Sequence, residues 1–171
     1  MHTQECSLTE EALHRQIGEI NVVFQYLENE LLEIEWFCTE AEALKPGRRF
    51  VDIIKDARGT VNAYLDRANV PQGAPVRRRF AQAFADVREA SKQRNLTVHS
   101  TYYWHESFQG SPSLTRTFAQ RDKNGTVERK TQPVTPQTVE SASELVNSVF
   151  EEFFALHRVL MYELPSTLTV Q

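Results

Sequence analysis

Residues 76–99 read VRRRFAQAFADVREASKQRNLTVH, and this stretch decides how the chain folds. Mostly apolar side chains recur in it at steps of four and three residues, which is the period of an α-helix that buries one face. The positions on this stripe are Phe80, Phe84, Val87, Ser91, Arg94 and Val98. The pattern predicts a helix that runs to about residue 99 and packs against other helices.

Three further segments have the same helical period: 7–43, 48–68 and 136–163. Ser7 and Glu10 have the spacing of a capping box, whose side chains satisfy the free N–H groups at a helix start. Thr135 suits the N-cap of the last helix and Pro136 suits its first position. We therefore expect a single helical domain, 1–171, with about four long helices.

Residues 100–132 have a different character. Residues 101–104 read TYYW and are rich in β-formers, and the runs 114–121 and 126–131 flank Lys123-Asn124-Gly125. Asn-Gly between two such runs is a strong signal for a β-hairpin. The sequence predicts an all-α fold in which a small β-hairpin, at about 100–132, is inserted between the third and fourth helices.

The composition fits one globular domain. The chain has 171 residues, of which 40% are hydrophobic and 25% are charged. No apolar run is long enough to span a membrane, and the polar, acidic N-terminus is unlike a signal peptide. With no export signal, Cys6 and Cys38 are expected to be reduced thiols in a cytoplasmic protein.

The net charge of −4 conceals a strong asymmetry. Residues 44–132 carry 17 basic and 8 acidic residues, a net charge of +9, whereas residues 1–43 have a net charge of −9. A basic central block is a plausible binding site for an anionic partner. The alternative is that acidic outer helices face this basic middle within one fold.

Arg94 lies on the stripe that the periodicity assigns to the core, where an arginine needs a partner. That partner would be an anion in a cleft or at a subunit interface, or a carboxylate on another helix. The candidate carboxylates are Glu28, Glu30, Glu33 and Glu35. In the second case Arg94 forms a buried Arg–Glu pair and His99 is a structural histidine.

A second, polar stripe consists of Arg88, Lys92, Asn95 and His99. Asn95 and His99 are four residues apart, so the amide can orient the imidazole. Arg94 and His99 are five residues apart and do not face each other on a regular helix. They converge only if the helix unwinds near residues 97–98 or if a second subunit supplies a symmetric copy.

Residues 94–99 have the form Arg-Asn-x-x-x-His, which resembles the signature of the HEPN (higher eukaryote and prokaryote nucleotide-binding) superfamily. The resemblance implies a metal-independent endoribonuclease that forms a homodimer in which the two motifs face each other. Such proteins recur in toxin–antitoxin, antiphage and RNA-processing systems. RNA is then the expected substrate, and an antitoxin or a nucleotidyltransferase is a candidate partner.

The residue types suit cleavage of RNA by its own 2′-hydroxyl. His99 is the candidate general base or acid, Arg94 the phosphate stabiliser, and Asn95 the group that orients His99 or binds phosphate. The candidate contacts to the RNA backbone are Arg77, Arg78, Arg79, Arg88 and Lys92. Neither a metal nor another cofactor is expected. The metal sites of ferritin-like helical bundles use two Glu-x-x-His pairs, and Glu11 and His14 form the one such pair in this chain.

Two other functions fit the same residues. A non-catalytic HEPN-like module would bind RNA or nucleotides, or would regulate a partner protein as a dimer. A purely structural helical dimer would do neither. Tyr102, Tyr103 and Trp104 have two roles open to them, stacking on bases or packing beneath the hairpin. His157, which lies among core-forming residues, is expected to be a structural or surface histidine.

Overall fold

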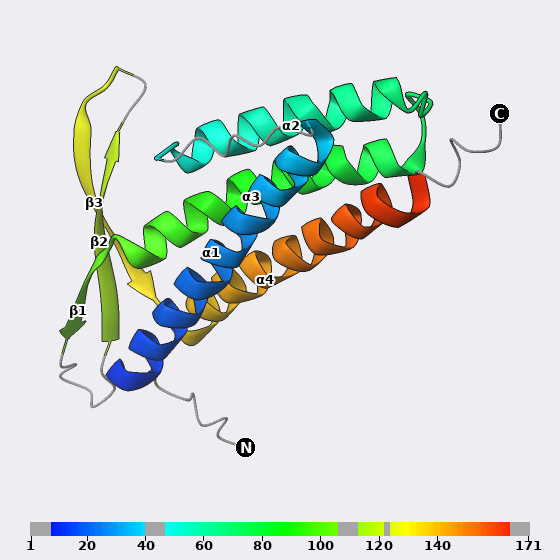
Figure 1. Ribbon diagram of the computed structural model, residues 1–171. Coiled ribbons are helices and arrows are strands. Elements are labelled where there is room, and N and C mark those ends of the chain that lie inside the picture. Colours follow the sequence, from blue (N-terminus) through cyan, green and yellow to red (C-terminus); the bar gives the residue numbers. More distant parts are fainter. Residues whose placement is uncertain (1–7, 40–46, 106–112, 122–123, 165–171) are drawn as a thin grey trace.

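The computed structural model describes residues 8–39, 47–105, 113–121 and 124–164 (Figure 1). Its helices are α1 (Glu10–Thr39), α2 (Phe50–Arg67), α3 (Pro75–Val98) and α4 (Pro136–Arg158), and α4 continues into a π-helical segment, Val159–Glu163. Its strands are β1 (Thr101–His105), β2 (Ser113–Arg121) and β3 (Val127–Val134). All three strands therefore come between α3 and α4 in the sequence.

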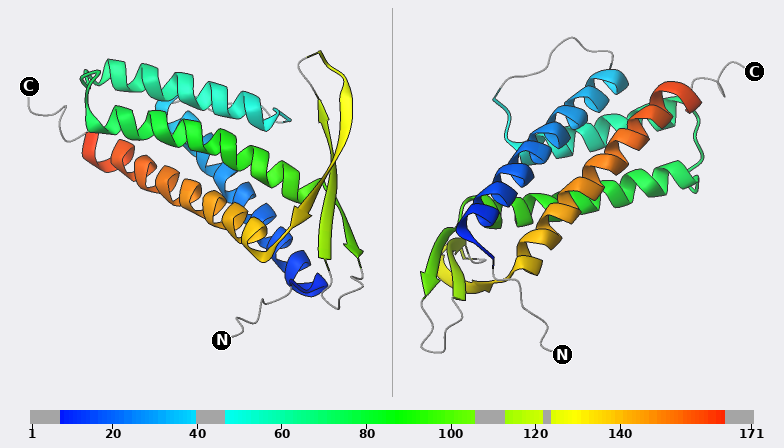
Figure 2. Two further views of the ribbon diagram at one scale, coloured as in Figure 1. Left: turned by 180° about the vertical axis from the view of Figure 1, so that it is seen from behind. Right: turned by 90° about the horizontal axis from the view of Figure 1, so that it is seen from below.

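The helices form an elongated bundle with the sheet at one end (Figures 1 and 2). α1 packs against α2 and α4, and α3 packs against α4. The apolar stripes meet in one continuous core, whose largest fully buried side chains include Leu27, Leu31, Val61, Phe80, Val87, Phe153 and Leu156. Each such side chain contributes roughly 1.5–3 kcal/mol through its removal from water.

The structure shows how the local sequence signals for the helices are used. Residues 48–68 and 76–99 were expected to be helical, and α2 and α3 cover nearly all of both ranges. Thr135 caps α4, since its side chain accepts a hydrogen bond from the Thr138 N–H at 3.2 Å. At α1, Thr9 provides the observed cap by accepting from the Ala12 N–H at 3.2 Å. Ser7 of the predicted capping box lies outside the described residues.

The predicted all-α class is wrong, because the chain forms a three-stranded antiparallel sheet in the order β1-β2-β3. The expected hairpin corresponds to β2 and β3, and Gly125 in its turn has a φ of +87°, which favours glycine. β1 pairs along the other edge of β2, with Thr101 opposite Thr117 and His105 opposite Ser113. This pairing satisfies backbone groups that a two-stranded hairpin would leave open. The fold is a helical bundle with a small antiparallel sheet.

The buried face of α3 also differs from the predicted stripe. Phe80, Phe84 and Val87 are buried as expected. Further along the helix, Ala90 and Thr97 are buried in place of Ser91, Arg94 and Val98, which are half-buried. Arg94 therefore lies at the edge of the core, where its aliphatic stem is covered and its guanidinium reaches polar groups.

Cys38 is buried and carries a free thiol. Burial raises the pKa of this thiol to about 12, so it is protonated and unreactive at neutral pH. Cys6 lies outside the described residues. None of the helices in the described part of the chain is long and apolar enough to cross a bilayer.

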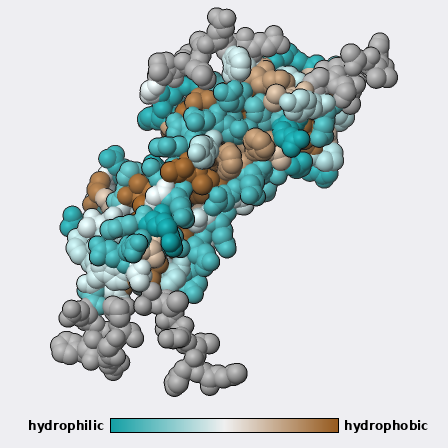
Figure 3. Space-filling view, turned by 60° about the horizontal axis from the view of Figure 1, so that its bottom comes forward, coloured by the Kyte–Doolittle hydropathy of each residue, from teal (hydrophilic) through white to brown (hydrophobic). Residues whose placement is uncertain are grey.

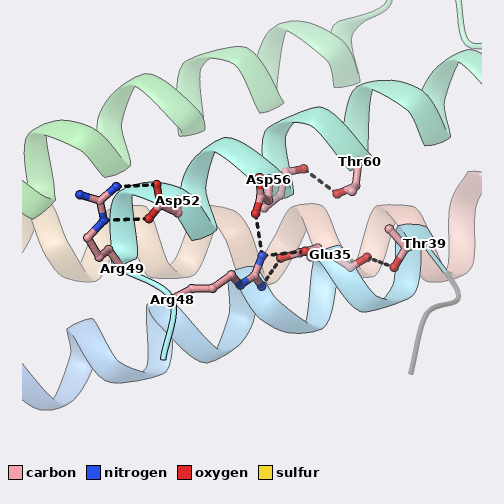
Figure 4. Close-up of polar contacts among 8 residues, drawn as sticks. Glu35, Thr39, Arg48, Arg49, Asp52, Asp56 and Thr60 are labelled. Carbon is pink, nitrogen blue, oxygen red and sulfur yellow. Dashed lines mark hydrogen bonds and ion pairs between the residues drawn. The ribbon is translucent and has the colours of Figure 1, made fainter. Parts of the chain in front are cut away.

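Arg48 joins the first two helices through two carboxylates (Figure 4). Its Nη1 and Nη2 donate to both carboxylate oxygens of Glu35 at 2.9 and 2.6 Å, and Nη1 also donates to Asp56 at 2.8 Å. The Arg48 side chain is 12% exposed. The hydrogen bond that Arg48 donates to Glu35, opposed by burial and aided by Asp56, holds the pKa of Arg48 above its ordinary value. The bidentate pair fixes α1 against α2.

We expect Arg48→Met to lower the free energy of unfolding by about 2 kcal/mol, because it leaves the Glu35 carboxylate half-buried without its cation. Urea denaturation measures this change. Arg49→Met is the matched control, since Arg49 pairs with Asp52 at the surface and its side chain is 80% exposed. Equal effects of the two substitutions would contradict a structural role for the Arg48 pair.

Candidate active site

The end of α3 brings Arg94 and His99 together within one chain. α3 ends at Val98, and His99 is the C-cap residue, with φ −102° and ψ 9°. Its backbone N–H still donates to the Asn95 carbonyl at 3.0 Å. Because the chain leaves the helix here, the imidazole turns back, and Arg94 Nη1 lies 3.2 Å from His99 Nε2. A second subunit is not needed to form this pair.

Every hydrogen-bond partner of Arg94 in the described part of the chain is electrically neutral. Nη2 donates to Asn21 Oδ1 on α1 at 2.7 Å, and Nη1 donates to Asn95 Oδ1 at 3.0 Å. The guanidinium carbon lies 5.2 Å from the centre of the Phe24 ring, which contributes a cation–π contact. Arg94 Nε is buried and has no hydrogen-bond partner. The positive charge of Arg94 is therefore held in place but not neutralised.

The alternative of a buried Arg–Glu pair is not seen, since Arg94 forms no ion pair in the described part of the chain, and two of the four candidate carboxylates have other partners. Glu35 binds Arg48, and Glu30 binds His157 Nδ1 at 2.6 Å. No ion pair involves Glu28 or Glu33 within the described ranges. His157 is the structural histidine that the sequence indicated.

The contact between Arg94 and His99 determines which imidazole nitrogen carries hydrogen. A guanidinium can only donate, so His99 Nε2 must accept and the neutral ring carries its hydrogen on Nδ1. Protonation of Nε2 would break this hydrogen bond and place two cations side by side. His99 is exposed, so a ligand can reach the ring.

Asn95 acts differently from the prediction. The spacing placed its amide beside the His99 imidazole, but its Oδ1 accepts from Arg94 and its backbone carbonyl accepts from the His99 N–H. Asn95 therefore positions Arg94 through its side chain and His99 through its backbone. Its side-chain amide is exposed, and its NH₂ group can donate to a bound anion.

A cleft of about 710 Å³ lies between the last turns of α3 and the sheet. Its helix wall consists of Lys92, Asn95, Leu96 and His99, and its sheet wall consists of Phe118, Ala119, Gln120 and Gln132. Sequence reasoning missed the sheet wall. The alternation of Leu114, Arg116 and Phe118 is a signal for a strand with one buried face, but it does not say which helix that face meets.

The predicted basic contacts do not all lie at this cleft. Lys92 lines it and also pairs with Glu89 at 3.0 Å, and Arg88 is exposed one turn earlier on α3. The hydrogen bonds that Glu89 accepts from Gln93 and Lys92 hold the pKa of its carboxyl below the usual value. These two basic side chains extend the positive surface along the helix.

Arg77, Arg78 and Arg79 lie in the first turn and a half of α3, at least about 20 Å from Arg94 at 1.5 Å per residue. Arg77 donates to the Val70 carbonyl at 2.8 and 3.0 Å and pairs with Asp66 at 2.7 Å. Arg79 pairs with Glu152 at 2.9 Å. Arg78 is exposed. The structure does not bring these three residues to the cleft.

Comparisons with protein-family models, with curated proteins and with solved structures find no match to this chain. The chemistry of the site is therefore judged from its own side chains. In the described ranges, no group of three or more His, Cys, Asp and Glu side chains is placed to hold a metal ion. The cleft is lined by an imidazole, amides and an ammonium, and the Arg94 guanidinium contacts the imidazole.

We expect the neutral His99 ring to be protonated on Nδ1 in the native protein and to shift toward Nε2–H in Arg94→Met. The reason is that Arg94 is the donor that occupies Nε2. Nitrogen chemical shifts of the imidazole, recorded by two-bond ¹H–¹⁵N correlation with the ring neutral, distinguish the two tautomers. Arg88→Met is the control, since Arg88 has no contact with His99. An Nε2–H ring in the native protein would contradict the observed geometry.

Proposed function

We propose that the chain is a HEPN-like, metal-independent endoribonuclease that cleaves RNA through attack of a 2′-hydroxyl on the adjacent phosphorus. The observation that carries this proposal is the approach of Arg94 Nη1 to within 3.2 Å of His99 Nε2, beside a cleft and without a neutralising carboxylate in the described part of the chain. A hydrogen-bond donor for phosphate and a proton acceptor are thus adjacent at a surface that a polynucleotide can reach.

The proposed reaction needs only these groups and the substrate. His99 removes the proton of the 2′-hydroxyl, and a bond forms between the 2′-oxygen and phosphorus. The bond from phosphorus to the 5′-oxygen breaks, and that oxygen takes up a proton from the imidazolium or from water. The products are a 2′,3′-cyclic phosphate and a 5′-hydroxyl. Arg94 donates to the phosphoryl oxygens, on which negative charge accumulates in the transition state.

Binding of the substrate would also free the base. A phosphate oxygen is a stronger acceptor for a guanidinium than a neutral imidazole or amide is. When Arg94 turns its Nη1 toward phosphate, His99 Nε2 loses its donor and becomes available to accept the 2′-hydroxyl proton. The Asn95 NH₂ group is placed to hold the same phosphate.

The test is incubation of the purified chain with single-stranded RNA in the presence of EDTA. We expect cleavage that leaves 2′,3′-cyclic phosphate ends, identified by mass spectrometry. His99→Ala is expected to reduce the rate by about 10²–10⁴-fold, the usual contribution of a general acid or base. His14→Ala, at an exposed histidine of α1, is the control and keeps the native rate.

Cleavage that survives in His99→Ala would contradict the proposed mechanism. Retention of RNA without cleavage by the native chain would instead support the non-catalytic module. For the toxin or defence type, the informative observation is a gene for an antitoxin or a nucleotidyltransferase beside the gene for this chain.

The proposal includes a homodimer. Exposed apolar side chains lie on α1 and α4, among them Val22, Tyr26 and Phe154, which are 47%, 56% and 51% exposed. Phe150 links the aromatic members of this group, since its ring centre lies 6.2 Å from those of both Tyr26 and Phe154. Figure 3 shows apolar residues along the middle of the face that α1 and α4 form. A second copy of the chain is the occupant that we propose for this face.

Light scattering coupled to gel filtration is expected to give twice the chain mass of 19.7 kDa. The double substitution Tyr26→Lys and Phe154→Lys should halve that mass, because four charges would then face one another across the two-fold axis. Val51→Lys is the control, since Val51 is an exposed apolar residue on α2. A native chain that is monomeric at all concentrations would contradict the dimer.

A further inference from the structure

Arg116 is a buried arginine without a carboxylate partner in the described part of the chain. It lies on the inner face of β2 between Leu114 and Phe118 and is 6% exposed. Its Nη2 donates to Gln132 Oε1 at 3.3 Å, and its Nε is buried without a hydrogen-bond partner. Its guanidinium carbon lies 6.0 Å from the centre of the Phe118 ring. These contacts replace little of the hydration that burial removes.

The other arginines that are similarly covered are paired. The side chains of Arg48 and Arg77 are 12% and 9% exposed, and both bind carboxylates. Arg116 differs from them and shares with Arg94 a charge that only neutral groups contact. An apolar residue at position 116 would fill the same space without the cost of an unpaired charge. Packing alone is therefore a poor reason for an arginine here.

The sheet places Arg116 directly behind the cleft. Gln132, its hydrogen-bond partner, lies opposite it on β3 and lines the cleft together with His99. On the other side, Tyr102 lies opposite Arg116 on β1, and its hydroxyl donates to the Thr97 carbonyl at 2.6 Å. This bond holds the sheet against the last turn of α3. Arg94 and Arg116 consequently each contact a residue that lines the cleft, His99 on the helix wall and Gln132 on the sheet wall.

Tyr102 gives further evidence of how close Arg116 lies to α3. Burial raises the pKa of the Tyr102 hydroxyl, and the charge of Arg116 and its hydrogen bond to the phenol act in the opposite direction. The phenol thus lies near the guanidinium and donates to the backbone of α3. Of the residues that line the cleft, Gln132 is the one that accepts a hydrogen bond from Arg116.

We propose that Arg116 and Gln132 form a second phosphate-binding subsite, which holds the RNA phosphate next to the scissile one. The inference rests on the proposed function for its ligand, since RNA presents consecutive phosphates to one cleft. Arg116 donates to the phosphate in place of Gln132 Oε1, and Gln132 turns its NH₂ group toward the same anion. Arg116 is thus a binding residue outside the segment 94–99.

The test measures binding of a fluorescent single-stranded RNA in which every 2′-hydroxyl is methylated, so that it cannot be cleaved. Arg116→Met is expected to weaken binding about 10- to 100-fold in an anisotropy titration at fixed salt, the usual loss for a charge-assisted hydrogen-bonded pair. The affinity of Arg116→Lys for the RNA should lie between those of the native chain and Arg116→Met, because lysine keeps the charge but not the planar guanidinium. Arg121→Met is the matched control and should stay within about threefold, since Arg121 is exposed on the opposite face of the same strand.

Stability separates a binding role from a structural one. If Arg116 binds a ligand, Arg116→Met keeps or raises the midpoint of urea unfolding while its affinity for RNA falls. If Arg116 only supports the sheet, the midpoint falls and affinity changes no more than folding does. Should Arg116→Met fail to fold, Arg116→Lys and Gln132→Ala decide, because position 132 is exposed and both are expected to weaken binding.

The inference is wrong if Arg116→Lys and Gln132→Ala bind the methylated RNA as tightly as the native chain does. It is also wrong if Arg121→Met loses as much affinity for this RNA as Arg116→Met does. It is also wrong if the native chain does not bind the methylated RNA. A native chain that binds this RNA but does not cleave unmodified RNA would overturn the nuclease and leave the phosphate subsite in place.

Discussion

The structure of the site depends on one guanidinium that is fixed without being neutralised. Asn21 from α1, Asn95 from its own helix and the Phe24 ring hold Arg94 at the edge of the core. A carboxylate in place of either amide would have satisfied the charge and closed the site to anions. Neutral acceptors orient the group and leave its charge unpaired, which is the electrostatic preorganisation that the proposed phosphate chemistry would need.

The sheet forms the second wall of a cleft beside this charged end of α3. Tyr102 anchors β1 to the Thr97 carbonyl, and β2 and β3 then stand across from Lys92, Asn95 and His99. A bundle that ended at His99 would expose the pair on an open surface, where solvent weakens every electrostatic contact. The three strands cover one side of the pair and add Arg116 behind Gln132.

The acidic and basic segments of the chain neutralise each other only in part. Glu35 with Arg48 and Glu152 with Arg79 join acidic helices to the basic middle of the sequence, as one reading of the charge asymmetry expects. Arg94 and Arg116 have no such acidic partner within the described residues. The excess positive charge is therefore not spread evenly, and part of it is concentrated at the end of α3.

The sequence by itself determined the helices and the β2–β3 hairpin, because the apolar period, the Thr135 cap and the Asn-Gly turn are local signals that neighbouring residues complete. It also singled out Arg94, Asn95 and His99. It did not show that β1 completes a sheet, that Glu35 and Glu30 bind Arg48 and His157, or that Arg116 contacts a residue of the same cleft. Those facts depend on strand register and on contacts between residues far apart in the chain, which packing in three dimensions decides and no local spacing encodes.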